Sequence, residues 1–116
     1  MKIPSIISAA LACVLATAVG PLLAAESGDA ATGAKKNSMC QGCHGIPGYK
    51  TVFPEVYSVP KLGGQYAAYI VKALQEYKSG NRGHPTMRAI AAGLTDKDMA
   101  DLAAHYGVEA PKTGAK

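Results

Sequence analysis

Two cysteines three residues apart, followed at once by a histidine, constrain this chain of 116 residues more than any other feature. In the run Cys40-Gln41-Gly42-Cys43-His44, both thiols lie on a single turn of helix and the imidazole comes next. Thiols so placed can form thioethers with the two vinyl groups on one edge of a porphyrin, while the histidine beneath the ring offers a nitrogen to iron. The pattern therefore predicts one covalently attached haem c.

Three other uses of a Cys-x-x-Cys pair fit the rest of the sequence less well. A redox-active disulfide of the thioredoxin type needs alternating strands and helices, and no such pattern is visible. A zinc site usually recruits a second pair of ligands, and His84 and His105 are poorly spaced to supply one. A plain structural disulfide remains open, but it would not require His44.

The first 25 residues have the layout of a secretory signal peptide. Two residues, Met1 and Lys2, give a positively charged start, and an uncharged apolar stretch follows that ends at Ala25. Two alternatives stay open. The segment is long enough to remain as an uncut membrane anchor, and Cys13 could be the lipidated first residue of a lipoprotein. We expect cleavage near residue 25 and export to the periplasm, with membrane attachment only if the signal is uncut.

Removal of the signal would leave about 91 residues, a length at which one hydrophobic core usually needs a disulfide, metal or cofactor as support. We therefore predict residues 1–25 as signal peptide, one domain over 26–110 and a flexible C-terminal tail over 111–116. The formal net charge is +4, but Lys and Arg are scattered along the chain. Nothing in this distribution suggests binding to nucleic acid.

Helical patterns dominate the predicted domain, and no stretch shows convincing strand alternation. Asp29 can cap a helix of small residues that runs to Cys40. Five glycines and three prolines between Gly42 and Gly64 predict an ordered loop.

Two further helices are indicated in the second half of the chain. The first ends at Gly80 and has apolar residues at helical spacing, namely Tyr66, Tyr69, Ile70, Ala73, Leu74 and Tyr77. The second begins at a capping box of Thr95 and Asp98. A short helical turn is expected over 87–92. The fold class is therefore all-α, with three main helices and long loops around one covalent haem.

Iron bound by His44 needs a ligand on its other face, which methionine sulfur or histidine nitrogen can supply. Met39 adjoins Cys40 and is held away from that face, while Met99 lies on the apolar stripe of the last helix. Met87 has neither constraint. It follows a loop-like segment 43 residues after His44, long enough for the chain to pass around the ring.

Met87 is thus the best candidate for the second ligand to iron. His84, three residues earlier, could ligate instead, and His105 is a weaker candidate. An open iron site is the remaining alternative.

Four segments together resemble the bacterial class I cytochromes c, of the small kind that also forms half of diheme periplasmic cytochromes. They are Cys40–Gly45, Pro60–Tyr66, Pro85–Met87 and Leu94–Ala103. The resemblance implies a cytochrome c-like fold and His/Met ligation of the haem iron, with Met87 as the distal ligand. It also implies that the carbonyl of Pro60 accepts the Nδ1 hydrogen of His44.

In that family the first and last helices cross at a small residue and an aromatic one, and Gly33 and Tyr106 fit these places. Many relatives also carry an aromatic residue on the first helix, where this chain has Lys36 and Asn37.

These features predict an electron carrier rather than an enzyme. It would shuttle single electrons between periplasmic redox proteins, from a reductase or dehydrogenase to an oxidase or reductase. A permanent haem-bearing subunit of a dehydrogenase or oxidase complex is the alternative, and a haem enzyme or gas sensor with an open iron site is a third. Apolar side chains around the ring would raise the reduction potential; we expect them to include Tyr66, Tyr69, Ile70 and Ile90.

Overall fold

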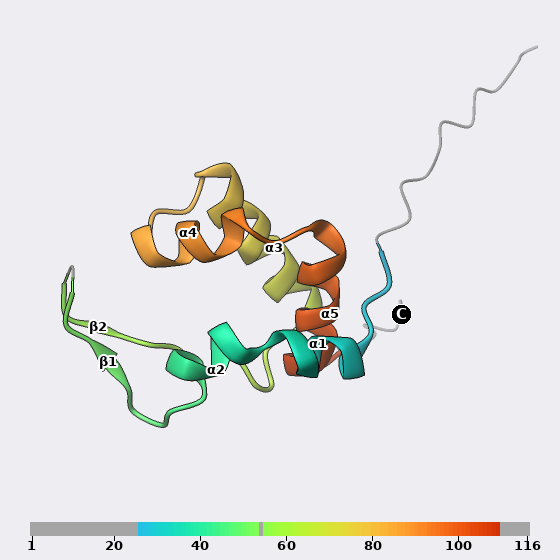
Figure 1. Cartoon of the computed structure of the whole chain (residues 1–116), viewed down its shortest axis with the longest axis horizontal. Coiled ribbons are helices and arrows are strands. Elements are labelled where there is room, and N and C mark those ends of the chain that lie inside the picture. The colour runs from blue at the N-terminus through green and yellow to red at the C-terminus, as the bar shows by residue number, and fades with distance from the viewer. Residues whose placement is uncertain (1–25, 54, 110–116) are drawn as a thin grey trace, which may run out of the picture.

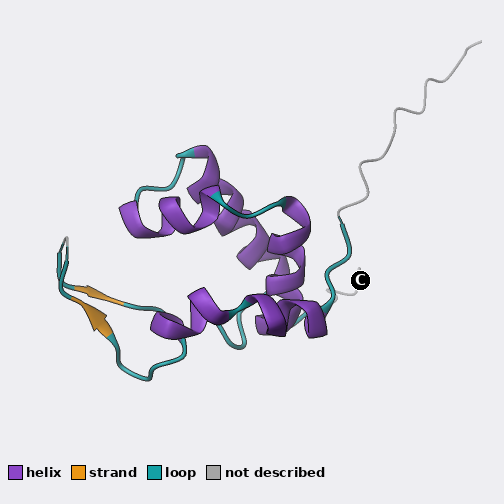
Figure 2. Ribbon diagram, viewed as in Figure 1, coloured by secondary structure: helices purple, strands orange, loops and turns teal. Residues whose placement is uncertain are grey.

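The computed structural model describes residues 26–53 and 55–109, and this part of the chain is mainly helical (Figures 1 and 2). Five helices occur in it: α1 (Ala30–Lys36), α2 (Ser38–His44), α3 (Ala67–Ser79), α4 (Pro85–Ala92) and α5 (Asp96–Tyr106). Two short strands, β1 (Lys50–Thr51) and β2 (Tyr57–Ser58), pair antiparallel between α2 and α3. The predicted signal peptide (1–25) and tail (111–116) lie outside the described residues.

The all-α prediction is confirmed, with two differences in how the helices are divided. The first predicted helix is interrupted at Asn37, whose carbonyl accepts the backbone N–H groups of Cys40 and Gln41 and so starts α2 anew. The expected turn over 87–92 is a complete helix that begins at Pro85. Proline suits the first helical position because the N–H that it lacks would have no partner there.

Helices α1 and α5 cross with their backbones in direct contact. A Cβ atom added to Gly33 would lie 2.0 Å from the carbonyl oxygen of Asp101, so only glycine fits. The side chain of Asp101 is 1% exposed, and it accepts hydrogen bonds from the backbone N–H of Asp29 at 2.8 Å and from Lys36 at 2.9 Å. Lys97 also donates to this carboxylate. Charged side chains therefore join the two helices at this crossing.

Helix α3 packs against α5 and α4. It ends at Gly80, whose φ of 86° is the left-handed conformation typical of a glycine after a helix. Backbone hydrogen bonds between Ala67 and Val108, and between Val108 and Gln65, fasten the start of α3 to the segment after α5. The buried apolar core comprises Ile70, Ala91, Met99, Ala100, Leu102 and Ala103.

No helix among the described residues combines the length and the apolar character needed to cross a membrane.

Candidate functional site

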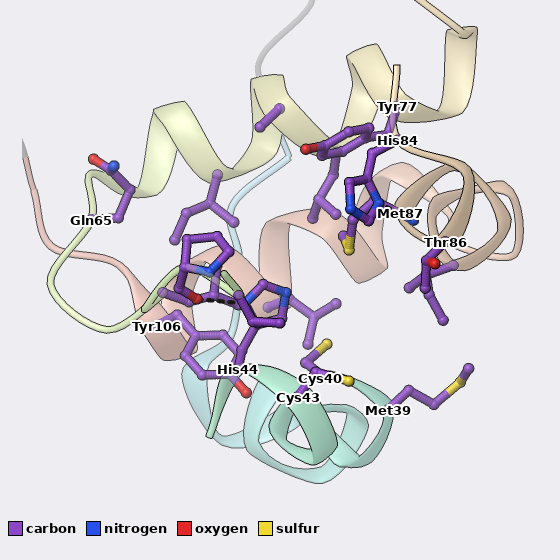
Figure 3. A pocket seen from close by; sticks show the side chains of 18 of the residues that line it. Met39, Cys40, Cys43, His44, Gln65, Tyr77, His84, Thr86, Met87 and Tyr106 are labelled. Carbon is purple, nitrogen blue, oxygen red and sulfur yellow. Dashed lines mark hydrogen bonds between the residues drawn. The ribbon is translucent and has the colours of Figure 1, made fainter. Parts of the chain in front are cut away.

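Helix α2 carries both cysteines and the histidine of the sequence motif. Cys40 and Cys43 are three residues apart on this helix, half-buried, and their thiols are free. Both side chains line the same cavity as His44, as Figure 3 shows. Burial raises the pKa of the Cys40 thiol, which keeps it in the neutral form. Two thiols therefore face one shared space.

The imidazole of His44 is oriented by a residue from the loop that follows the strands. Its Nδ1 lies 2.6 Å from the carbonyl oxygen of Pro60, as the dashed line in Figure 3 marks. A carbonyl can only accept a hydrogen bond, so Nδ1 carries the proton. The other ring nitrogen, Nε2, then keeps its lone pair for a metal ion.

Met87 lies on the facing wall of the cavity. It is the third residue of α4, half-buried, and its sulfur points into the space that the two thiols and His44 border (Figure 3). His84 immediately precedes α4 and also lines the cavity. Its Nδ1 accepts the backbone N–H of Met87 at 3.3 Å.

The remaining candidates for the second ligand lie elsewhere or point away. Met99 is fully buried in the core, and His105 is 3.0 Å from the side-chain nitrogen of Asn37 without lining the cavity. Met39 borders the cavity, but it is 68% exposed and its sulfur points away from the thiols in Figure 3. Of the two methionines that line the cavity, Met87 directs its sulfur at the space opposite His44 and Met39 does not.

The walls of the cavity are mostly apolar and come from every helix except α1. Its apolar lining includes Val59, Leu62, Ile70, Ala73, Leu74, Ile90, Leu94 and Leu102. Of the four side chains expected around the ring, Tyr69, Ile70 and Ile90 line the cavity. Tyr66 does not: it forms a backbone bridge with Val108 outside it. Tyr66 immediately precedes α3, and its backbone pairing with Val108 fixes its position. The helical spacing of apolar residues in the sequence does not reveal this pairing.

A cluster of polar side chains on one wall was not anticipated from the sequence. The guanidinium of Arg82 lies 4.9 Å from the ring centre of Tyr77 and donates to the hydroxyl of Tyr69 at 3.1 Å. That hydrogen bond raises the pKa of Arg82 above its usual value. The ring of Tyr57, from β2, completes the cluster by packing edge-on against His84.

The chemistry of these groups fits a covalently bound haem. Two neighbouring thiols, one imidazole with a free Nε2 and one inward-pointing thioether border the same apolar space. Soft sulfur and imidazole nitrogen are the donors that haem iron takes in electron carriers. Within residues 26–53 and 55–109, no three His, Cys, Asp or Glu side chains cluster as a separate metal site.

Comparison with known proteins gives concordant results. A family model described as cytochrome c matches residues 30–105. The chain is 42% identical over 91 residues to cytochrome c4 of Thiocapsa roseopersicina, covering 78% of this chain and 44% of that protein. It is 39% identical over 83 residues to cytochrome c-554(548) of Halomonas halodenitrificans, covering 69% of this chain and 95% of that protein.

Among solved structures, reduced recombinant cytochrome c4 from Pseudomonas stutzeri superposes with a TM-score of 0.50 at 32% identity. The match covers 70% of this chain and 50% of that one. The chain thus spans about half the length of the cytochrome c4 proteins that it matches.

Proposed function

This chain belongs to the cytochrome c family, and we propose that it carries single electrons in the periplasm on one haem c bound through Cys40 and Cys43. Membership makes it a c-type cytochrome, an electron carrier with covalently bound haem. The described residues contain one Cys-x-x-Cys-His run, which supports one haem per chain. When bound, haem iron takes up one electron in passing from ferric to ferrous and releases it on returning.

One observation carries the proposal: His44 and Met87 face each other across the apolar cavity that the two thiols border. His44, with Nδ1 bonded to Pro60, would present Nε2 to one face of the iron. Met87 would present its sulfur to the other. Because His44 and Met87 come from opposite walls of the cavity, both could stay in place in either oxidation state, and little rearrangement would oppose electron transfer.

The surroundings of the cavity favour the reduced state. A thioether ligand raises the potential relative to two histidines, and apolar walls disfavour the extra positive charge of ferric iron. Ile70, Leu74 and Ile90 supply part of this wall and would exclude water from a bound haem. The reduction potential of this protein should therefore be higher than that of a haem bound by two histidines.

Because the bound haem would exchange single electrons, we expect the partners to be other redox proteins of the periplasm. The donor would be a reductase or dehydrogenase and the acceptor an oxidase or reductase, each docking briefly through a small interface. Export would depend on the predicted signal peptide over 1–25. Cell fractionation tests this directly: the haem protein should leave with the periplasmic contents, and retention in the membrane pellet would indicate an uncut anchor.

Haem attachment is tested on the full chain matured in a periplasm that makes c-type cytochromes. A haem-stained denaturing gel should show covalent haem, and the pyridine haemochrome spectrum should give one haem per chain. Cys40→Ala and Cys43→Ala should each lose one thioether and shift the haemochrome band. Mature wild-type protein without covalent haem would refute the proposal.

The second ligand is tested by comparing two cavity methionines. The oxidised wild type should show the weak far-red charge-transfer band of methionine sulfur on ferric iron. Met87→Ala should abolish the band and let the reduced protein bind carbon monoxide, whereas Met39→Leu should do neither. A band that survives Met87→Ala would overturn the assignment.

A further inference from the structure

We propose that His84 is a positioning residue, which holds Met87 on the wall facing His44 and does not itself bind iron. The inference rests on the proposed function, because it concerns the residue assigned there as the second ligand. Three features of His84 support it: its place at the start of α4, the hydrogen bond that it accepts and the aromatic rings around it.

His84 caps the helix that carries Met87. Its backbone is extended, with φ −167° and ψ 108°, and Pro85 follows at the first helical position. The Nδ1 of its ring accepts the N–H of Met87, the third residue of the helix, at 3.3 Å. This is the geometry in which Ser, Asn or Asp usually caps a helix. The ring therefore fixes the backbone of the very residue whose sulfur enters the cavity.

Aromatic side chains from two other elements hold the ring of His84. The ring of Tyr57, from β2, packs edge-on at 5.0 Å between centres, and that of Tyr77, from α3, packs at 6.5 Å. The start of α4 is thus tied to both the strand pair and α3. Rotation of the His84 ring away from Met87 would disturb both of these contacts.

The hydrogen bond to Met87 also argues against His84 as a ligand. Because Nδ1 accepts, the proton of the neutral ring is on Nε2. A histidine that binds iron through Nε2 carries its proton on Nδ1 instead, and this nitrogen could not accept from Met87. Ligation by His84 and capping by His84 therefore exclude each other, and the structure has the cap.

The test replaces His84 in the haem-loaded protein with residues that remove or keep the side-chain acceptor for the backbone N–H of Met87. His84→Ala removes it, whereas His84→Asn keeps a side-chain oxygen that suits this position. His105→Ala is the matched control, since His105 lies outside the cavity. Added imidazole competes with Met87 for ferric iron, so its binding constant reports how firmly the sulfur is held. Far-UV circular dichroism verifies that each variant is folded.

We expect imidazole to bind His84→Ala about fivefold more tightly than wild type, the factor that corresponds to the loss of a typical cap. The far-red band should weaken in parallel. His84→Asn should regain most of the wild-type behaviour, and His105→Ala should match wild type. Wild-type imidazole affinity in His84→Ala, or no recovery in His84→Asn, would overturn the positioning role.

A failure of the ligand assignment itself gives a different result. If His84 bound iron, the wild type would lack the methionine band, and His84→Ala alone would open the iron to carbon monoxide. If Met87 is the ligand but His84 does not position it, the band is present and unchanged in His84→Ala. The two failures are therefore told apart by the wild-type spectrum.

Discussion

The Nδ1 of His44 donates to the carbonyl oxygen of Pro60 at 2.6 Å, across sixteen residues of chain. The acceptor is a backbone atom, so its position depends on how rigidly the loop holds Pro60. The pyrrolidine ring fixes φ at that residue and thereby limits the directions in which the carbonyl can point. The loop and the haem-binding helix are thus joined through the residue that would bind iron.

Pro60→Ala should loosen this hydrogen bond without removing the acceptor. We expect the Nδ1 proton of His44 to exchange with solvent faster, by up to about fivefold, the factor equivalent to the net free energy of one whole hydrogen bond. The reduction potential should rise, because a weaker bond makes the imidazole a poorer electron donor to iron. Proton NMR of the ferrous protein measures the exchange. Pro47→Ala, in the loop between α2 and β1, is the control, and equal exchange rates in both variants would contradict the prediction.

Gly33→Ala should destabilise the crossing of α1 and α5. The added methyl group would lie 2.0 Å from a backbone oxygen of α5, so the helices must separate. The expected loss is about 1–3 kcal/mol in the free energy of unfolding, as for other overpacked sites. Gly42 is the matched control, because it is also helical but a Cβ there meets nothing within 4 Å.

Urea unfolding of the haem-loaded variants, followed by far-UV circular dichroism, measures the difference. Gly42→Ala should be neutral or stabilising by about 0.4–1 kcal/mol, because alanine restricts the unfolded chain. Equal stabilities of the two variants would show that the crossing tolerates a methyl group.

Asp98 should make the protein sensitive to acid. Its hydrogen bonds with Lys36 and with Thr95 lower the pKa of its carboxyl group from 3.8 to about 2. A carboxylate whose pKa is lower in the folded state stabilises the fold above its unfolded pKa and loses this contribution as pH falls through the folded one. Stability from Asp98 should therefore be complete above pH 4 and decline towards pH 2.

Asp98→Asn keeps a side-chain acceptor for the helix cap but removes the charge. The variant should melt below wild type at pH 6, and the difference should shrink as pH falls towards 2. Glu76→Gln is the control, since Glu76 forms only an exposed pair with Lys72 at 3.6 Å, and such pairs contribute little. A difference in melting temperature that stays constant between pH 6 and pH 2 would contradict the prediction.

The features that could be predicted correctly from the sequence depend on interactions between residues that are close together in the chain. Asp29 caps α1, and Thr95 with Asp98 forms the capping box of α5, because each pattern is complete within four residues. The break at Asn37 left no such signal. The strand pair β1–β2 has only two residues in each strand, too few to show alternation.

The same distinction applies to the candidate site. The Cys-x-x-Cys-His run is a local pattern, so the sequence alone points to its residues as the candidates for haem attachment. The ion pair of Lys36 with Asp101 spans 65 residues, and the packing of Tyr57 on His84 joins a strand to a helix cap. Contacts of this kind depend on the folded path of the chain, so no local pattern reveals them.

The side chains of Arg82 and Tyr77, which both line the cavity, should be energetically coupled. The guanidinium lies 4.9 Å from the ring centre of Tyr77, within the range of a cation–π interaction. A double-mutant cycle of Arg82→Gln and Tyr77→Leu should give a coupling of about 0.5–1 kcal/mol in the free energy of unfolding. Tyr77→Phe keeps the ring and should preserve most of the coupling, whereas Tyr69→Phe should remove only the 3.1 Å hydrogen bond to Arg82. Additive effects of Arg82→Gln and Tyr77→Leu would mean that the guanidinium and the ring are neighbours without attraction.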